Sequence, residues 1–366
     1  MQVDRIALTH FRNYDSLQME FHPAVNVIYG DNAQGKTNLL ESVSFLSGLS
    51  PRTRLEREMI QFGQENACVK GQISSRGRTF AVEISLRSGC RKHVTANGVR
   101  LKNTAELSSI LRCVLFCPDD LFLIRQGAAA RRKFMDDCIC QLRPRYHAAV
   151  TEYRRLYEQK SAILRDYEEK PSFLDTLDDF SYQMAQVGAV IIHYRSAFVH
   201  RLQQTAPPIH QSFSGNRECL TLRYRTVSAV EHPDAPRSEL ASWLWQHQQS
   251  HRAAELAARQ CLSGPHKDDL LVDIGGISAK TFASQGQTRT AALSLKLAAR
   301  DIFFQDSGEY PVLLLDDVLS ELDTRRQEFV LNRLAGGQVF ITCCENDRLG
   351  KLLTGQVFHI QNGGMT

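Results

Sequence analysis

Apolar and polar residues follow two different periods along the chain, and each period predicts its own kind of element. The segment AVNVIY, residues 24–29, alternates β-branched and aromatic residues as a strand does, and KTNLLESVSFLSGL, residues 36–49, has the pattern of a helix. Val312–Leu315 is a continuous apolar run, which is typical of a strand buried on both faces. A further helix is predicted after residue 287, since one face is apolar and neither Pro nor Gly occurs before Gly308.

Helical patterns dominate the middle of the chain. Two long stretches are separated by Glu169, Lys170 and Pro171, which predicts a helical hairpin, and Pro144 must interrupt or bend the first stretch. The heptads continue for only a few turns, too few for a long coiled-coil arm. The predicted elements here are helices at 131–167 and 172–204, a strand at 218–227 and a returning helix at 238–262.

The length of the chain exceeds the usual size of a single hydrophobic core. At 366 residues, two domains or one domain with a large insertion are expected. Apolar residues make up 43% of the chain and charged residues 23%, close to the average for soluble globular proteins. We expect an α/β fold with an inserted, mainly helical domain, divided into residues 1–119, 120–258 and 259–366.

The start of the chain and its cysteines bear on the compartment. Asp4 and Arg5 stand where a signal peptide needs an apolar core, and no apolar run approaches the roughly 18 residues of a membrane span. We therefore expect a cytoplasmic protein without a membrane partner. The ten cysteines match neither a zinc-binding spacing nor a small secreted scaffold, and we interpret them as reduced, mostly buried thiols.

The net charge of +4 is too small to indicate a nucleic-acid partner by itself, but the charge is unevenly distributed. Between Arg125 and Arg165, ten Lys and Arg residues stand against four Asp and Glu residues. Some recur at helical spacing and could form a stripe along a phosphate backbone, although a solvated helix face is the commoner explanation. No recognition helix is apparent, so base readout is not expected. The candidate stripe comprises Arg131, Arg132, Lys133, Arg154 and Arg155.

The segment GDNAQGKTNLLE, residues 30–41, fits the pattern G-x-x-x-x-G-K-[ST] of a phosphate-binding loop. It stands between a predicted strand and a predicted helix, as that motif requires. Backbone N–H groups at the helix start face the phosphates, Lys36 reaches the β and γ oxygens, and Thr37 can bind Mg²⁺. A glycine-rich structural turn is the alternative. The predicted binding residues are Gly30, Asp31, Asn32, Ala33, Gln34, Gly35, Lys36 and Thr37.

A nucleotide site also needs a carboxylate for Mg²⁺ and a group that orients the attacking water. Asp316 and Asp317 follow the apolar run at 312–315, so we predict that Asp316 holds the metal through its shell and that Asp317 positions or deprotonates the water. Two acids at a plain strand-to-loop exit are the alternative. The predicted catalytic residues are Lys36, Asp316 and Asp317, and the predicted metal ligands are Thr37 and Asp316.

A second anion site is predicted at the start of the helix after residue 287, because a serine and a glycine at a helix N-terminus expose N–H groups. One chain cannot readily aim two helix N-termini at one triphosphate, whereas two chains packed head to tail can, which predicts a homodimer. An ordinary N-capped helix is the alternative and the more frequent reason for such a serine. His266 and Lys267, ahead of this helix, are either structural or near the nucleotide. The predicted anion-binding residues are Ser284, Gln285, Gly286 and Gln287.

With these three pieces in this order, the sequence resembles the ABC-type ATPase heads of the SMC and Rad50 class, and within that class the RecF family of bacterial recombination mediators. The resemblance covers essentially the whole chain. It is carried by FRNY (11–14), GDNAQGKTNLLE (30–41), SPRTR (50–54), CPDDL (117–121), RRKFMD (131–136), GPHKDDL (264–270), FASQGQTRTAALSLKLA (282–298) and VLLLDDVLSELD (312–323).

The resemblance implies roles for four of these segments. Residues 30–37 would form the Walker A loop, and Asp316 with Asp317 would form Walker B. Residues 284–287 would be the signature motif that contacts the γ-phosphate held by the partner copy. Residues 320–323 would be the D-loop at the dimer seam.

The resemblance also implies one further contact and marks three departures from the pattern. Arg12 is expected to touch the nucleotide, as in similar heads. Asp317 stands where most ABC ATPases carry Glu, a feature shared by RecF-like chains that fits slow hydrolysis. Cys343 follows the predicted strand QVFIT where transporters carry a switch histidine, and CPDDL stands near the place of the glutamine loop without a glutamine.

The function implied by the resemblance is ATP-dependent DNA binding in repair, with ATP and Mg²⁺ as cofactors and a weak DNA-dependent ATPase activity. ATP would close two heads into a homodimer that grips double-stranded and single-stranded DNA at gap junctions. RecF-like proteins act with RecO and RecR, help load RecA, and support DNA replication, recombination and the SOS response. The alternative is an ATP-switched DNA-binding scaffold with incidental turnover. A transporter subunit is a third possibility, which Cys343 and the helical insertion oppose.

Overall fold

The structure of the chain, a computed structural model, describes residues 1–49, 56–169, 171–344 and 355–365. The SPRTR motif therefore lies outside the described residues. By its internal contacts the chain divides into two compact units, Met1–Phe122 with Leu295–Thr366, and Leu123–Ser294. The second unit extends to Ser294, beyond residue 258 where the inserted domain was expected to end. No described helix has the length and apolar character needed to cross a membrane.

A six-stranded, largely parallel sheet forms the centre of the first unit, with the order β15-β14-β3-β13-β12-β8. Every residue of β12 and β13 is buried, as expected for strands covered on both faces. The strands predicted at 24–29, 312–315 and 338–342 are all present. The sheet consists of β3 (Val25–Tyr29), β8 (Cys113–Phe116), β12 (Val312–Leu315), β13 (Val339–Cys343), β14 (Gln356–Gln361) and β15 (Gly364–Met365).

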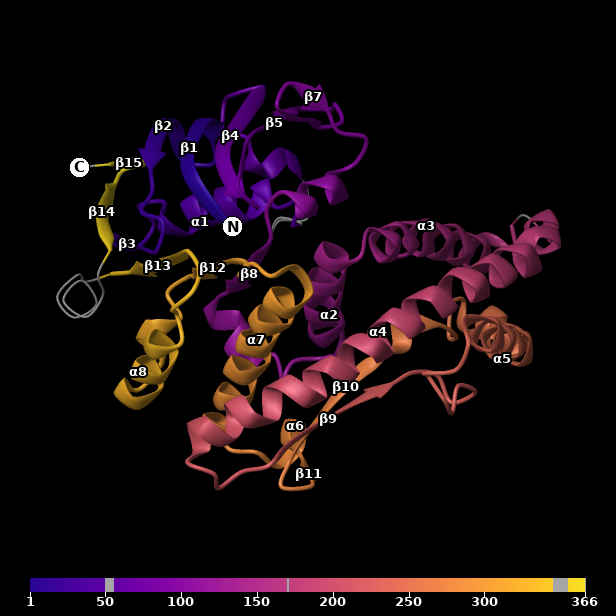
Figure 1. Cartoon of the computed structure of the whole chain (residues 1–366). Coiled ribbons are helices and arrows are strands. Elements are labelled where there is room, and N and C mark those ends of the chain that lie inside the picture. The colour runs from indigo at the N-terminus through magenta and orange to yellow at the C-terminus, as the bar shows by residue number, and fades with distance from the viewer. Residues whose placement is uncertain (50–55, 170, 345–354, 366) are drawn as a thin grey trace. The chain divides into compact units, whose positions relative to one another are not determined.

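A second, antiparallel sheet completes the first unit, with the order β2-β1-β4-β5-β6-β7 (Figure 1). Buried and exposed positions alternate along its strands, so one face packs on the core and the other faces water. Its buried side chains join those of the helix α1 in one hydrophobic cluster. The strands are β1 (Gln2–Phe11), β2 (Tyr14–Glu20), β4 (Asn66–Ser75), β5 (Arg78–Arg87), β6 (His93–Ala96) and β7 (Val99–Arg100).

Helix α1 (Lys36–Leu46) begins at the predicted phosphate-binding lysine and is shorter than the predicted range of 36–49. It ends because the chain turns at Gly48, whose φ of 80° is in the left-handed region that favours glycine. Helix α7 (Gln285–Ser307) confirms the helix predicted after residue 287. Residues 285–294 of α7 are counted with the second unit and residues 295–307 with the first. The first unit further contains η1 (Glu56–Met59), η2 (Thr104–Ser109), η3 (Pro118–Phe122), η6 (Leu319–Glu321) and α8 (Thr324–Asn332).

The second unit is mainly helical, and its helices α3 and α4 form the predicted hairpin (Figure 1). Pro144 begins α3 and so separates it from α2, as the sequence predicts. Helix α4 continues through Pro207 and Pro208, well past residue 204, because its last turns pack against β9. The elements are α2 (Ala128–Leu142), α3 (Pro144–Asp166), η4 (Pro171–Thr176), α4 (Leu177–Ser214), β9 (Leu220–Arg225), α5 (Arg237–Ala258), η5 (Pro265–Lys267), β10 (Asp269–Ile274), β11 (Ile277–Ser278) and α6 (Ala279–Phe282).

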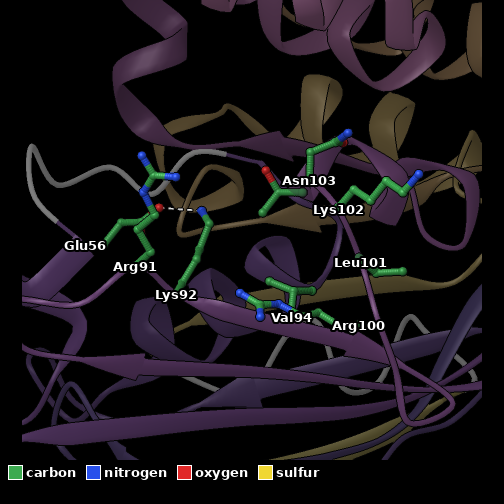
Figure 2. A pocket seen from close by; sticks show the side chains of 9 residues that line it. Glu56, Arg91, Lys92, Val94, Arg100, Leu101, Lys102 and Asn103 are labelled. Carbon is green, nitrogen blue, oxygen red and sulfur yellow. Dashed lines mark hydrogen bonds and ion pairs between the residues drawn. The ribbon is translucent and has the colours of Figure 1, made fainter.

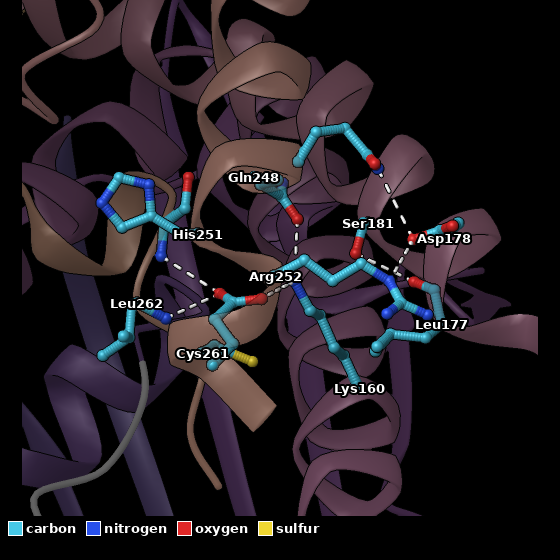
Figure 3. A network of polar contacts seen from close by, with 12 residues as sticks. Lys160, Leu177, Asp178, Ser181, Gln248, His251, Arg252, Cys261 and Leu262 are labelled. Atoms are coloured by element: carbon cyan, nitrogen blue, oxygen red, sulfur yellow. Dashed lines mark hydrogen bonds and ion pairs between the residues drawn. The ribbon is translucent and has the colours of Figure 1, made fainter. Parts of the chain in front are cut away.

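Buried charges tie the helices of the second unit together. The side chain of Lys160 on α3 is fully buried, and its Nζ lies 2.6 Å from Glu255 Oε2 on α5 and donates to Gln248 Oε1 at 2.9 Å (Figure 3). The other oxygen of Glu255 accepts from the backbone N–H of Leu262 at 2.7 Å. Because both charges have left water, each depends on the other, and the pair fixes α3 against α5.

All ten cysteines are free thiols, in agreement with the prediction of reduced cysteines. Their burial is more varied than expected. Four side chains are buried, three are partly buried, and Cys90, Cys219 and Cys344 are exposed.

Candidate nucleotide-binding site

The predicted phosphate loop runs from the end of β3 to the start of α1, and its two glycines sit where no other residue fits. Gly30 has a φ of 151°, and a Cβ there would lie 2.3 Å from the carbonyl oxygen of Ile360. Gly35 has a φ of 117°, and a Cβ there would lie 2.6 Å from Asn13 Nδ2. The motif glycines are therefore required by backbone conformation and by close neighbours.

Segments from both ends of the chain hold the loop in place. The buried hydroxyl of Tyr14 donates to the Gly35 carbonyl at 2.9 Å, and Asn13 Nδ2 donates to the Gln34 carbonyl at 3.0 Å. From the C-terminal hairpin, the backbone N–H of Asn362 donates to Gln34 Oε1 at 2.6 Å and that of Gly363 donates to the Gln34 carbonyl at 3.1 Å. Asn13 and Tyr14 of the FRNY motif thus hold the backbone of the loop through hydrogen bonds.

The ammonium of Lys36 lies inside the curve of the loop. Its side chain is 4% exposed, and Nζ donates to the carbonyls of Gly30 at 2.6 Å and Asp31 at 2.9 Å. The thiol of Cys344, which follows β13, lies 3.9 Å from the same nitrogen and contacts Asn32 Oδ1 at 3.1 Å. The loop thus concentrates donors and one positive charge at the N-terminus of α1.

The parallel sheet brings the loop and the predicted carboxylates together, although they are far apart in sequence. Thr37 Oγ1 donates to Asp316 Oδ1 at 2.9 Å, and Thr342 Oγ1 donates to the same oxygen at 3.0 Å. Asp316 is 2% exposed. Thr342 lies on the strand predicted at 338–342, but it was not among the predicted site residues. A polar residue near the carboxyl end of an apolar strand was the available signal.

Asp317 has an unusual backbone and an unsatisfied carboxylate. Its φ is 51°, and its backbone N–H donates to Thr342 Oγ1 at 2.8 Å. Its Oδ1 is buried and has no hydrogen-bond partner in the part of the chain that the structure describes. Burial raises the pKa of this carboxyl, Lys36 lowers it, and the neighbouring Asp316 raises it further. A buried acceptor without a partner is the kind of group that binds water or a ligand.

The thiol at the position of the transporter switch histidine is neutral. Cys343 is buried at the end of β13, and burial raises the pKa of its thiol to about 11, with a further contribution from the charge of Asp317. It therefore carries no charge near pH 7.

Arg12 is committed to the protein rather than pointing freely toward the loop. Its guanidinium donates to both oxygens of Glu41 on α1 at 2.9 and 3.0 Å, and to the carbonyl of Glu58 at 2.9 Å. A cavity of about 1000 Å³ borders this ion pair, and its lining includes Arg12, Asn38 and the turn at 60–64. Phe62 at the tip of that turn is fully exposed.

The signature segment forms a reciprocal N-cap at the start of α7. The Ser284 hydroxyl accepts from the backbone N–H of Gln287 at 3.2 Å, and Gln287 Oε1 accepts from the backbone N–H of Ser284 at 2.8 Å. This is a capping box, so the alternative of an N-capped helix is realised. The cap does not exclude ligand binding, since Ser284 and Gln285 remain exposed.

Two other motifs have structural partners within the first unit. In CPDDL, Asp120 Oδ2 accepts from the backbone N–H of Cys117 at 3.0 Å, and Asp120 Oδ1 lies 2.8 Å from Lys296 Nζ on α7. In the predicted D-loop, Ser320 donates to the Asp317 carbonyl at 2.5 Å, and Asp323 caps α8. The CPDDL segment, which stands near the place of the glutamine loop, therefore holds α7 through the ion pair between Asp120 and Lys296.

The predicted basic stripe is wrong for Arg131. That side chain is buried, its Nε and Nη2 donate to the two oxygens of Asp269 at 2.7 and 3.0 Å, and its Nη1 donates to three carbonyls. Arg132 donates to the Asp268 carbonyl at 2.6 Å, and Arg155 pairs with Glu152. A helical repeat in sequence does not reveal which residues face the interior of a helical bundle. In this stripe, Arg131 faces the interior.

His266 and its neighbours form part of the interior of the second unit. Its Nδ1 lies 2.9 Å from the Tyr153 hydroxyl, and its Nε2 lies 3.0 Å from the Cys261 carbonyl. Burial lowers the pKa of His266 to about 4. The question left open by the sequence is answered for this residue, which has a structural role, whereas Lys267 is exposed.

The comparisons with known proteins agree with this geometry. The family model described as RecF/RecN/SMC N terminal domain matches residues 2–362. The DNA replication and repair protein RecF of Agathobacter rectalis is 37% identical over 368 residues, covering 99% of this chain and 98% of that protein. A solved structure of the recombination mediator protein RecF-ATP in the RecFOR pathway is 32% identical, with a TM-score of 0.90, covering 100% of this chain and 96% of that chain.

More distant relatives share the fold alone. The Smc head domain of Pyrococcus furiosus is 14% identical with a TM-score of 0.54, covering 100% of this chain and 95% of that chain. The parallel sheet, the loop at 30–37 and this likeness define an ABC-type ATPase head of the SMC kind, with an inserted, mainly helical region. The chain belongs to the RecF/RecN/SMC N-terminal domain family and, within it, to the RecF proteins.

Proposed function

We propose that the chain binds ATP with Mg²⁺ at residues 30–37 and that ATP controls its binding to DNA in recombinational repair. Two kinds of relative support this proposal: proteins named for DNA replication and repair, and the solved structure of RecF-ATP. The observation that carries it is the hydrogen bond of 2.9 Å between Thr37 Oγ1 and Asp316 Oδ1, since it joins the two halves of the predicted site across the sheet.

Lys36 would supply the positive charge for the triphosphate. Its three N–H donors now meet two neutral carbonyls, those of Gly30 and Asp31. Anionic phosphate oxygens accept stronger hydrogen bonds than carbonyls do. We expect Nζ to turn from the loop carbonyls to the β and γ oxygens, while the N–H groups at the start of α1 donate to the same phosphates.

The residues beside the loop fit a magnesium ion. The hydroxyl of Thr37 would bind the ion directly and Asp316 would hold it through a bound water, because Mg²⁺ keeps several waters and takes few protein ligands. When bound, Mg²⁺ neutralises charge on the β and γ oxygens. Asp317, with its buried Oδ1, would accept a proton from the attacking water or orient that water.

The cavity beside Arg12 would receive the adenosine. It is large enough for a base and ribose, at about 1000 Å³, and it opens next to Asn38 on the helix that follows the loop. The exposed ring of Phe62 offers a face on which a base could stack. Arg12, held by Glu41, would line this cavity and reach the nucleotide at its edge.

A second copy of the chain would complete the site. Ser284 and Gln285 are exposed at the N-terminus of a 23-residue helix, where the positive end of the helix dipole favours an anion. Gly286 and Gln287 complete this helix tip, and Phe282 beside it is 73% exposed, which suits a protein contact. In the proposed homodimer, each helix tip caps the γ-phosphate bound to the other copy, and residues 320–323 lie at the seam.

The proposed dimer binds double-stranded and single-stranded DNA at gap junctions through the phosphate backbone. Hydrolysis opens it, and the ATPase activity is weak and DNA-dependent. RecO and RecR as partners, the loading of RecA, and support of replication and the SOS response are proposed on the resemblance to RecF proteins and on the RecFOR pathway of the solved relative.

The ATP site is tested with Lys36→Ala. We expect binding of a fluorescent ATP analogue to weaken at least about tenfold, because the lysine contributes a charge-assisted contact in a site that excludes water. Lys70→Ala is the matched control, since Lys70 is an exposed lysine that pairs with Glu83 and lies on β4, a strand of the antiparallel sheet, whereas the loop follows β3 of the parallel sheet. Equal binding by both variants would refute the assignment of the loop.

The contact with the second copy is tested by Ser284→Asp. Aspartate is as good an N-cap as serine, so the helix should keep its stability, but its charge would repel a γ-phosphate. Sedimentation with ATP and Mg²⁺ should therefore detect a dimer for the wild type and only monomer for this variant. A full ATP-dependent dimer of Ser284→Asp would contradict the proposed cap.

A second candidate function is an ATP-switched scaffold with negligible turnover. It is favoured by the short side chain of Asp317, which is one methylene shorter than the Glu of most ABC ATPases and reaches less far toward an attacking water. Asp317→Asn should keep ATP binding and dimerisation in either case. Loss of DNA repair in cells carrying this variant would support functional hydrolysis, whereas undiminished repair would support the scaffold.

A further inference from the structure

A basic pocket lies at the end of the antiparallel sheet in the first unit, formed by residues that the nucleotide site does not use. Its volume is about 660 Å³. Figure 2 shows Arg91 and Lys92 on one side, Lys102 and Asn103 on the other, and Val94 with Arg100 between them. The nucleotide site lies at the carboxyl ends of the strands of the parallel sheet. ATP binding there does not account for the basic residues of this pocket.

The pocket carries a clear excess of positive charge. Its lining holds four Lys and Arg residues and one acid, Glu56, which leaves a formal excess of three. Glu56 is already paired with Lys92, whose Nζ also lies 5.5 Å from the centre of the Phe45 ring. Arg91, Arg100 and Lys102 are exposed, and none has an ion-pair partner within the described ranges. Cations grouped in this way create a positive potential that attracts a polyanion.

The sequence around the pocket explains why, among the described residues, only Lys92 of its four cations has an acidic partner. Residues 87–104 contain five Lys and Arg and no Asp or Glu. The acids nearest in sequence on the C-terminal side begin with Glu106, and that carboxylate is used by the backbone: its Oε1 accepts from the N–H groups of Lys102 at 3.1 Å and Asn103 at 3.2 Å. Glu106 therefore does not neutralise the side chains of Arg91, Arg100 and Lys102, and the pocket keeps its excess of positive charge.

The backbone that carries Arg100 and Lys102 is held by hydrogen bonds. Glu106 and Asn103 form the capping box of η2, and the backbone N–H of Leu101 donates to the Val94 carbonyl at 2.9 Å. Arg100 is held in β7, opposite Thr95 of β6. A ligand would therefore have to order only the ends of the side chains, which lowers the entropy that its binding removes.

The arrangement favours a chain of phosphates over a single phosphate. The cations come from two separate segments, residues 91–92 and residues 100–102, and Val94 with Arg100 lies between Lys92 and Lys102 (Figure 2). A site for one phosphate would converge its donors on one point. Asn103 is the single uncharged amide on the lining, so the pocket has little means to read a base edge.

We propose that this pocket binds the phosphodiester backbone of DNA, with Arg91, Arg100 and Lys102 as the contacting cations. The inference rests on the proposed function as a DNA-binding protein and assigns part of that binding to a particular surface. It also places the contact on the sheet that packs against α1, the helix that begins at the phosphate loop.

The test compares two double variants that remove the same charge from different parts of the antiparallel sheet. Arg91→Gln with Arg100→Gln empties the pocket of two cations. Arg76→Gln with Arg78→Gln removes two exposed arginines, Arg78 at the start of β5 and Arg76 in the turn before it, where Arg76 Nε lies 3.9 Å from Glu309 Oε2. Binding of a fluorescently labelled duplex of random sequence is measured by anisotropy with Mg²⁺ and a non-hydrolysable ATP analogue over a series of salt concentrations.

The pocket variant should bind the duplex at least about tenfold more weakly at about 0.1 M salt, and the slope of log K against log salt should be shallower by about 2, one for each lost phosphate contact. The control variant should keep the wild-type slope. Arg100→Lys, which keeps the charge, should keep the slope as well. Binding of the ATP analogue should be the same in all four proteins.

Wild-type affinity and slope in the pocket variant would overturn this inference and leave the proposed function standing. A wild-type protein that binds the ATP analogue but no DNA at any salt concentration would instead refute the proposed function. An equal loss of affinity in the pocket variant and the control would indicate a general effect of net charge and would also overturn the inference.

Discussion

Residues 87–104 and residues 125–165 are both rich in Lys and Arg, but the acids that balance them lie in different places. The helical segment has ten basic residues against four acids, and the sheet segment has five against none. In the helical segment the missing acids come from distant parts of the chain: Arg131 meets Asp269, and Lys160 meets Glu255. For the sheet segment, Glu56 is the one acid from outside it that forms an ion pair with it among the residues that the structure describes. A local count of charge therefore overstates the positive surface of the helices, whereas for the sheet segment it is nearly correct.

The largest expected effect is that of Arg131→Met, which leaves Asp269 buried without its main partner. We expect the free energy of unfolding to fall by about 3 to 5 kcal/mol, because a buried carboxylate loses its guanidinium. Urea unfolding followed by circular dichroism measures it. The matched control is Arg154→Met on the exposed face of α3, which should stay within about 0.5 kcal/mol of the wild type. Similar stabilities would mean that Arg131 belongs to a solvated surface after all.

Lys160→Met should cost nearly as much, about 3 kcal/mol, since Glu255 would be left charged and buried. Adding Glu255→Gln should recover part of the loss, because the amide oxygen still accepts from the backbone N–H of Leu262 while the unpaired charge disappears. The double-mutant cycle in urea gives the coupling. Strictly additive losses would contradict a direct pair between α3 and α5.

A smaller change in the free energy of unfolding is expected from pH, through His266 in the second unit. Burial lowers the pKa of His266 to about 4, below its usual 6.5, so between these values the unfolded chain binds a proton that the folded chain does not. Stability should fall as pH falls through this window, by about 2 kcal/mol in all, less than the full shift because the ring is partly exposed.

The nearby Asp268 acts with the opposite sign. Burial raises the pKa of its carboxyl to about 6, so the folded chain holds a proton that the unfolded chain has lost, and stability falls as pH rises toward 6. The contribution of His266 is isolated by comparing the wild type with His266→Gln at each pH. If both proteins have the same pH profile, the histidine is not held neutral by burial.

The smallest expected effect is that of Arg155→Gln. Arg155 is exposed and paired with Glu152 one turn earlier, so its stability should change by less than about 0.5 kcal/mol. Its slope of DNA affinity against salt should equal that of the wild type. A slope shallower by about 1 would restore the helical segment as a DNA-contacting surface and weaken the contrast between the two segments.

The sequence predicted those parts of the site that depend on neighbouring residues. The loop at 30–37, the strand before it and the helix after it are read from local pattern, and so is the acidic end of β12. Parallel pairing through β13 then brings Thr37 to Asp316. Thr342 was missed because its role arises from the register of three strands, which no local pattern specifies.

The parts that the sequence could not predict depend on contacts between distant segments. Arg131 and Arg155 look alike in a helical repeat, yet one is buried and the other is exposed. The end of α4 was expected near residue 204, since proline in a helix removes a hydrogen bond and crowds the preceding turn. Packing of its last turns against β9 outweighs that cost.

The support of the phosphate loop by the C-terminal hairpin has a consequence for the order in which the protein can fold. Strand β3 and the loop are synthesised early, but both sheet neighbours of β3, β13 and β14, belong to the last part of the chain. During translation β3 therefore lacks both of its neighbouring strands, and the loop lacks its C-terminal support, until residues 339–363 have left the ribosome. A fusion or truncation at the C-terminal end should accordingly first disrupt the hydrogen bonds from Asn362 and Gly363 to Gln34, near the other end of the sequence.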